Sequence, residues 1–283
     1  MKKILFSLLS IVSMKCMSTL IMPDLKGLEN VPVIIAAQNA AQKGDWNKVY
    51  SCIRNLEDAS FKMATETALV IAVDRGDLEG VKLLVKYGAD VNKRVVVQDL
   101  KTCEGYSSYA KMKLVGYAAM KKHWDVVKYL IEYGALIEDH HVSNVYDSIE
   151  FMLNETASQG NLSMFQYFLQ NWVISDITKM GALYYLLEWQ DNDTDLECIK
   201  ALISAGTAMN LSNLNDEDRE QFSDDTLEPL VYAALSKNIA KVQLLLDAGA
   251  NLTQAIEKAE VILNEYQEKE LEDAITLLKN FVK

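Results

Sequence analysis

The residues with the greatest capacity for chemistry are acidic, and they lie in two runs. The first run places acidic side chains at alternate positions, Asp191, Asp193, Asp195 and Glu197. A calcium-binding loop begins with this spacing, but it also needs Gly at its sixth position and a bidentate Glu at its twelfth. Leu196 and Leu202 occupy those two positions here. The sequence therefore predicts an acidic turn exposed to solvent and no calcium site.

The second acidic run is denser and consists of Asp216, Glu217, Asp218, Glu220, Asp224 and Asp225. Charged loops are usually exposed, so solvation alone accounts for these side chains. The functional alternative is a negatively charged projection that accelerates encounter with a Lys- or Arg-rich partner. On this alternative, Asp216, Glu217 and Asp218 are candidate protein-binding residues.

Other reactive side chains lack the neighbours that catalysis or metal binding requires. His140 and His141 are adjacent in the chain, and adjacent residues rarely face the same metal ion. No residue near Cys103 in the sequence is recognisable as a general base that could activate its thiol. The chain also lacks the phosphate-loop, serine-nucleophile, zinc-protease and kinase motifs. We therefore expect a protein that is not an enzyme and that uses no metal or cofactor.

Composition narrows the class of partner. The 283 residues are 50% hydrophobic and 24% charged, which is typical of a globular chain. The net charge of -12 argues against nucleic acid, whose phosphates require clustered Lys and Arg. The four cysteines have no regular spacing, so neither a disulfide framework nor a zinc site is predicted. We expect Cys52 and Cys198 to be buried, inert thiols.

A sequence pattern recurs along most of the chain. It is clearest as TALVIAVDRGDLEGVKLLVKYGADVN, from Thr67 to Asn92. Its ending returns as VKYLIEYGAL, IKALISAGTA and VQLLLDAGAN, which begin at Val127, Ile199 and Val242. Recurrence at intervals of about 30 to 50 residues is typical of a solenoid, in which each unit buries its apolar faces against its neighbours. This pattern resembles the ankyrin repeat, which implies a binding scaffold.

On that frame the chain is predicted to be an all-α solenoid of stacked helix-turn-helix units with a C-terminal capping helix pair. About six units are expected within residues 33–252, and apolar residues three and four apart predict capping helices over 253–283. Residues 1–18 are expected to be a signal peptide and 19–32 a linker. The units begin at about Ile35, Thr67, Lys113, Phe151, Gly181 and Glu228.

Insertions between units are expected to project as fingers, which can vary without disturbing the core. The two longest lie within Lys93–Met112 and Asn210–Leu227. Tyrosine is enriched at interface hot spots because it combines a large area with a polar tip. The tyrosines selected as protein-binding candidates are Tyr106, Tyr109 and Tyr146 in loops between units and Tyr117 on a first helix.

The N-terminal segment resembles an export signal. Lys2 and Lys3 precede an apolar stretch from Ile4 to Met14, which is too short to span a bilayer. Cleavage near Ser13 or Ser18 would release the chain to the periplasm or the exterior. Two alternatives are an uncleaved membrane anchor and an amphipathic first helix, which would leave the protein membrane-anchored or cytoplasmic.

These observations favour a non-catalytic, exported scaffold that mediates protein–protein interaction. The partner would be another protein with a basic surface, and a membrane would be involved only if the N-terminal segment is retained. A membrane-tethered structural or adaptor protein is one alternative. An enzyme whose site lies in the inter-repeat insertions is another.

Overall fold

The structure is a computed structural model, and it describes residues 19–21, 31–99, 108–138, 148–188, 194–223 and 225–282. The chain divides into two compact units. The N-terminal unit contains the described residues up to Phe151, and the C-terminal unit contains those from Met152 onward. The division lies within helix α7, and each unit is described by itself below.

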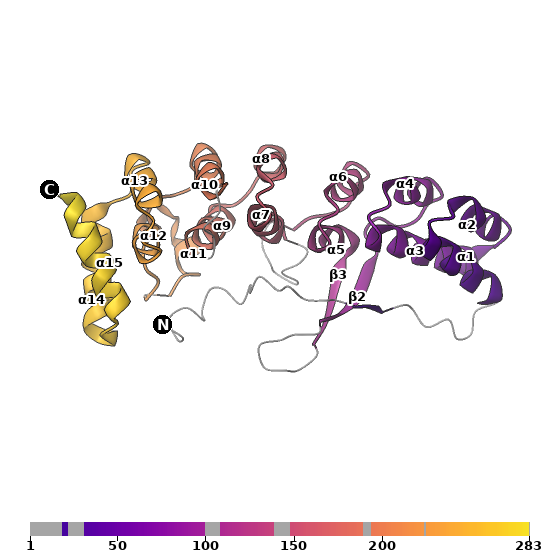
Figure 1. The fold of residues 1–283 in the computed structure, drawn as a ribbon, viewed down its shortest axis with the longest axis horizontal. Coiled ribbons are helices and arrows are strands. Elements are labelled where there is room, and N and C mark those ends of the chain that lie inside the picture. Colours follow the sequence, from indigo (N-terminus) through magenta and orange to yellow (C-terminus); the bar gives the residue numbers. More distant parts are fainter. Residues whose placement is uncertain are drawn as a thin grey trace. The chain divides into compact units, whose positions relative to one another are not determined.

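The N-terminal unit consists of three helix pairs and a small sheet. Its helices are α1 (Val31–Lys43), α2 (Trp46–Ile53), α3 (Asp58–Asp74), α4 (Leu78–Lys86), α5 (Leu114–Met120) and α6 (Trp124–Glu132). Its strands are β1 (Thr19–Ile21), β2 (Arg94–Asp99) and β3 (Ser108–Lys113). The helices stack in two rows, with α1, α3 and α5 in one and α2, α4 and α6 in the other (Figure 1).

Helix α7 (Ile149–Ser158) leads into the C-terminal unit. The α-helices that follow are α8 (Leu162–Asn171), α9 (Asp176–Glu188), α10 (Asp195–Ser204), α11 (Asp216–Arg219), α12 (Pro229–Leu235), α13 (Ile239–Asp247), α14 (Leu252–Tyr266) and α15 (Lys269–Lys279). Two short 3-10 helices are η3 (Leu211–Asn213) and η4 (Asn280–Val282). Helix α9 packs against α12, and α10 packs against both α8 and α13 (Figure 1). The all-α repeat fold is therefore confirmed.

Local residue chemistry fixes the turn inside each helix pair. Gly76 has φ +67°, a left-handed conformation that Gly adopts without steric cost. The following Asp77 caps α4 by accepting a hydrogen bond from the N–H of Gly80 at 3.1 Å. At two other turns a lysine takes the left-handed position, Lys122 with φ 66° and Lys237 with φ 56°. The packing of the flanking helices must offset the strain at these two turns.

Stacking buries the apolar stripe of each helix. Leu69 on α3 and Leu84 on α4 are fully buried. Gly80 on α4 faces the indole of Trp46 on α2, and a Cβ atom at this position would lie 2.3 Å from the ring. The indole N–H of Trp46 donates to Asp77 Oδ2 at 2.8 Å. Gly80 therefore lets α2 and α4, the second helices of adjacent pairs, approach each other closely.

The sheet lies in the N-terminal unit and has the strand order β1-β2-β3. Strands β2 and β3 form an antiparallel hairpin, and β1 pairs antiparallel with the other edge of β2. In this register Val97 lies opposite Leu20 of β1 and Ala110 of β3. Val95, Val97 and Met112 are at least 95% buried, and both strands contact α5. The base of the hairpin is therefore part of the core.

This sheet adds detail to one expectation drawn from the sequence and differs from another. The insertion within Lys93–Met112 was expected to project as a finger, and its described part consists of two paired strands whose base is anchored by buried side chains. Residues 19–32 were expected to be a linker, and they contain strand β1 and the first two residues of α1. The linker expectation failed because β1 pairs with β2, a segment far from it in the sequence.

The C-terminal end of the fold is closed by α14 and α15. Both helices pack against α12, and they also pack against each other. Helix α14 begins at Leu252, one residue before the predicted boundary of the cap. Its buried residues are Ala255, Ile256, Ala259 and Ile262, at helical spacing.

Candidate functional site

Charge is distributed very unevenly along the chain. Residues 152–283 contain 22 Asp and Glu but only 9 Lys and Arg, whereas residues 1–151 contain 18 and 19, out of totals of 40 and 28. The acidity of the protein therefore lies in the C-terminal unit. An excess of one sign raises the local concentration of oppositely charged partners and accelerates their encounter.

The densest acidic segment of this unit has a defined structure. Asn215 caps helix α11, and its side chain accepts a hydrogen bond from the N–H of Asp218 at 2.8 Å. Asp216 is 89% exposed at its side chain and accepts a hydrogen bond from Arg219 at 2.5 Å. Glu217 is exposed and Asp218 is half-buried. The three predicted binding residues thus lie together on one short helix.

Buried apolar residues hold this segment against the repeats. Leu214 and Phe222 flank α11 and are 4% and 9% exposed. The ring of Phe222 lies 6.0 Å from that of Tyr184 on α9, and the Tyr184 hydroxyl donates to the carbonyl of Leu227 at 2.7 Å. Burial, reinforced by the charges of nearby groups, raises the pKa of Tyr184 well above its usual value. The acidic segment is therefore a fixed element of the surface.

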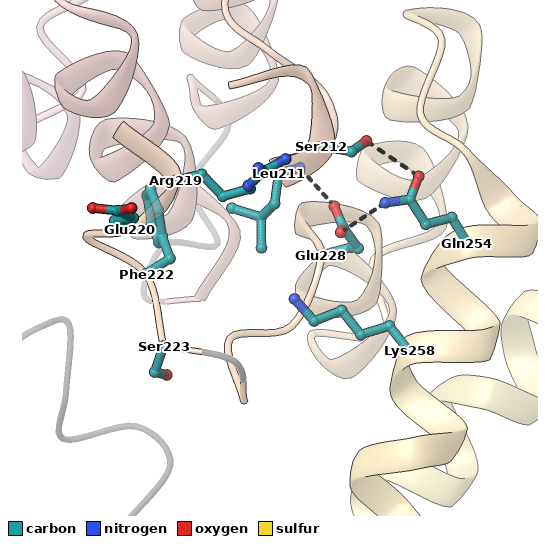
Figure 2. Close-up of a pocket in the computed structure, with 9 residues that line it drawn as sticks. All are labelled: Leu211, Ser212, Arg219, Glu220, Phe222, Ser223, Glu228, Gln254 and Lys258. Carbon is teal, nitrogen blue, oxygen red and sulfur yellow. Dashed lines mark hydrogen bonds between the residues drawn. The ribbon is translucent and has the colours of Figure 1, made fainter. Parts of the chain in front are cut away.

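A pocket of about 670 Å³ opens between this segment and the capping helix α14 (Figure 2). This volume lies within the range of small-ligand sites. Its walls combine apolar, hydroxyl, amide and charged side chains. They are Leu211, Ser212, Arg219, Glu220, Phe222, Ser223, Glu228, Gln254 and Lys258.

Glu228 is the most deeply buried charged residue of the pocket, at 2% exposure. Its Oε2 accepts a hydrogen bond from the N–H of Leu211 at 2.8 Å, and its Oε1 accepts one from the Gln254 amide at 3.4 Å (Figure 2). Ser212 in turn donates to the Gln254 side-chain oxygen at 3.3 Å. Glu228 thereby connects the start of the insertion, the start of α12 and the capping helix.

The described tyrosines among the predicted binding residues, Tyr109 and Tyr117, lie in the N-terminal unit, whereas these acids lie in the C-terminal unit. Tyr106 and Tyr146 lie outside the described residues. Tyr109 lies in β3 opposite Gln98. Tyr117 was expected to be accessible, and that expectation is wrong because its side chain is fully buried. Its hydroxyl donates to Asp74 Oδ1 at 2.5 Å, which joins the second and third helix pairs.

The first acidic run also differs from expectation. Asp191 and Asp193 lie outside the described residues, but Asp195 is 1% exposed and lies 3.5 Å from the ammonium of Lys241. Asp195 is therefore a buried partner of Lys241 and not part of a solvated turn. Glu228 was not among the predicted site residues. The only local signal for it in the sequence was its position directly before Pro229.

Other types of site find little support in the described part of the chain. No group of three or more His, Cys, Asp or Glu residues there could hold a metal ion. Cys198 is fully buried, and burial followed by the charges of Asp195 and Glu197 raises its thiol pKa to about 12. Such a thiol is protonated and unreactive near neutral pH. Within the same described ranges, no helix has the length and apolar character needed to cross a membrane.

Comparison with known proteins places the helix pairs among ankyrin repeats. The sequence model of the ankyrin repeat matches residues 66–95. Notch-regulated ankyrin repeat-containing protein A of Danio rerio is 35% identical over 99 residues, covering 33% of this chain and 77% of that protein. The Homo sapiens Notch-regulated ankyrin repeat-containing protein is 34% identical, covering 33% and 75%. A solved ankyrin repeat domain from Acinetobacter baumannii AYE matches with a TM-score of 0.49 and 17% identity, covering 79% of this chain and all of that one.

Proposed function

Because this chain belongs to the ankyrin-repeat family, whose repeats mediate protein–protein interaction, we propose that it is a non-catalytic scaffold that binds a basic surface of another protein. The proposed contact is the acidic segment of the C-terminal unit, centred on Asp216, Glu217 and Asp218. The observation that supports it most directly is that this segment is both strongly acidic and fixed in place by Leu214 and Phe222.

Electrostatics and rigidity act together in this proposal. The excess of acidic residues in the C-terminal unit attracts a cationic partner, which increases the association rate. A segment that is already ordered loses little conformational entropy when it binds. A disordered acidic loop would give the attraction without this second advantage.

A second contact region and export also belong to the proposal. The insertion that carries Tyr106 and Tyr109, and the loop that carries Tyr146, are proposed to form a separate contact region on the N-terminal unit. The N-terminal segment is proposed to direct the chain to the periplasm or the exterior. Mass spectrometry of the purified natural protein tests this, because export predicts loss of about the first 13 to 18 residues. An intact Met1 in a membrane fraction would instead support the tethered alternative.

The binding proposal is tested by replacing the three acids with their amides, as Asp216→Asn, Glu217→Gln and Asp218→Asn. Amides keep the size of the side chains. The Asn215 side-chain amide also donates a hydrogen bond to Asp218 Oδ2 at 2.8 Å, and Asn at position 218 keeps an oxygen that can accept it. The matched control replaces three exposed acids of α15, as Glu270→Gln, Glu272→Gln and Asp273→Asn. Both variants lose the same charge from the same unit.

Immobilised wild type and both variants are used to capture proteins from the source organism, with quantitative mass spectrometry as the readout. We expect at least one basic protein to be retained by wild type and by the control and to be depleted on the α11 variant. The amount of this protein retained on wild type should decrease as the NaCl concentration is raised from about 50 to about 300 mM, since salt screens exposed charges. Equal retention by all three chains would reject the acidic segment as the contact.

A further inference from the structure

The pocket beneath α11 contains a buried carboxylate without a cationic partner. Glu228 is 2% exposed, and it forms no ion pair with any residue in the described part of the chain. Its two hydrogen bonds come from neutral donors, the N–H of Leu211 and the amide of Gln254. Removing a carboxylate from water is costly unless a counter-charge compensates for it. The pocket gives such a counter-charge access, because Glu228 lines it.

The other walls suit a long cationic side chain. Leu211 and Phe222 are buried apolar residues that line the pocket and can contact the methylene stem of Arg or Lys. Glu220 is exposed and lines the same pocket. In Figure 2, Phe222 lies across the open space from Glu228, and the carboxylate of Glu220 lies beyond Phe222 and points away from that space. An entering cation would therefore meet the carboxylate of Glu228 and an apolar surface formed by Leu211 and Phe222.

Two cations of the chain line this pocket as well. Arg219 is engaged by Asp216 at 2.5 Å. Lys258 extends from α14 toward the open space, and within the described residues it forms no ion pair (Figure 2). The alternative occupant of the pocket is an acidic group of a partner, with Lys258 as its counter-charge. The burial of Glu228 and the large acidic excess of this unit favour a cation instead, since the field of the unit repels anions.

We propose that this pocket receives an Arg or Lys side chain of the partner protein, with the carboxylate of Glu228 as its counter-charge. The proposal rests on the proposed function and deepens it, because it names the anchoring group of the basic partner. Lys258 then competes with the incoming cation, and its flexible stem lets it turn toward solvent when the pocket is filled.

The test uses three labelled peptides that differ only at the central residue. Their sequence is Ac-Gly-Ser-Leu-X-Leu-Ser-Gly-amide, where X is Arg, citrulline or Glu. Citrulline has the shape of Arg without its charge. Binding to the full chain is measured by fluorescence anisotropy at low salt. The unmodified protein should bind the Arg peptide at least about tenfold more tightly than the citrulline peptide, because only Arg can form a buried ion pair with Glu228.

Two variants and one control locate the site. Glu228→Gln keeps an acceptor for the Leu211 N–H and should reduce affinity for the Arg peptide at least about tenfold. Lys258→Met removes the competing cation and should increase that affinity. Glu272→Gln removes one exposed charge of α15 and should leave it nearly unchanged. Circular dichroism verifies that each variant is folded, and the peptide series on the unmodified chain does not depend on any variant.

Several outcomes would contradict the proposal that this pocket binds a cation. Tight binding of the Glu peptide that Lys258→Met abolishes would overturn the proposal in favour of a pocket for acidic groups. Equal binding of the Arg and citrulline peptides would also overturn it. Loss of Arg-peptide binding on the α11 amide variant together with unchanged binding on Glu228→Gln would reject the pocket while leaving the acidic segment as the contact. Failure of the capture experiment alone would instead count against the proposed function.

Discussion

The ammonium of Lys241 lies 3.5 Å from the carboxylate of Asp195, and both side chains are 1% exposed. The same ammonium donates a hydrogen bond to the carbonyl of Leu186 at 2.7 Å. Lys241 is on α13, Asp195 begins α10 and Leu186 is on α9, so one buried cation joins the fifth helix pair to the sixth.

Replacing Lys241 with Met should strongly destabilise the protein, because it leaves the buried Asp195 without its cation. The expected loss is about 3–5 kcal/mol in the free energy of unfolding, measured in urea. Asp195→Asn should reverse part of that loss when it is added to Lys241→Met, since the buried negative charge is then removed. Strictly additive losses in the double variant would contradict the pairing.

The repeats themselves were predictable from the sequence because the residues that determine each turn lie close together in the chain. The Gly76-Asp77 turn needs one left-handed residue and one side-chain cap, and both are visible within a few positions. The roles of Asp195 and Glu228 were not predictable in the same way. Each side chain is buried by contacts with segments distant in the sequence. The residue type alone does not show whether an Asp or Glu will be buried or exposed to solvent.

The sheet and Tyr117 were missed for a related reason. The stretch of three valines from Val95 to Val97 lies in an insertion, where the repeat pattern gives no guidance about structure. Its strand character depends on pairing with β1 and β3. Tyr117 lies on a first helix, where a polar tip suggested exposure, but Asp74 from the preceding repeat satisfies its hydroxyl in the interior.

The buried position of Tyr117 leads to a prediction that separates folding from binding. Tyr117→Phe removes the hydrogen bond to Asp74 and keeps the ring, so the free energy of unfolding should fall by about 1 kcal/mol. Tyr117→Ala also leaves a cavity and should cost about 3–5 kcal/mol. In the capture assay Tyr117→Phe should retain the same proteins as wild type. Selective loss of one of them would restore Tyr117 as a contact residue.

The two described cysteines should differ sharply in reactivity. Cys198 is buried as expected, with its pKa raised to about 12, whereas Cys52 was also expected to be buried and is instead half-buried. In a chain with Cys16→Ser and Cys103→Ser, Ellman's reagent at pH 8 should titrate one thiol in the native state and two in urea. The fast thiol should disappear on Cys52→Ser. Two fast thiols in the native protein would contradict the burial of Cys198.

Stability should decline at alkaline pH, and Tyr232 supplies part of the decline. Its ring is 9% exposed and lies 5.0 Å from that of Tyr184. Burial, followed by the charge of Glu188, raises its pKa from 10.0 to about 12. The folded state therefore holds this proton more tightly than the unfolded state does. The resulting stability is fully present below pH 10 and is lost as the pH rises from 10 through about 12.

Tyr232→Phe removes this titration and keeps the ring in the core. Between pH 9 and 11.5 the free energy of unfolding of the wild type should fall more steeply than that of the variant, by on the order of 2 kcal/mol over the full window. Tyr184, whose pKa is also raised, continues to titrate in both proteins, so the variant still loses stability. Urea unfolding at several pH values gives the two slopes. Parallel curves would show that the Tyr232 hydroxyl ionises as readily in the folded chain as in the unfolded one.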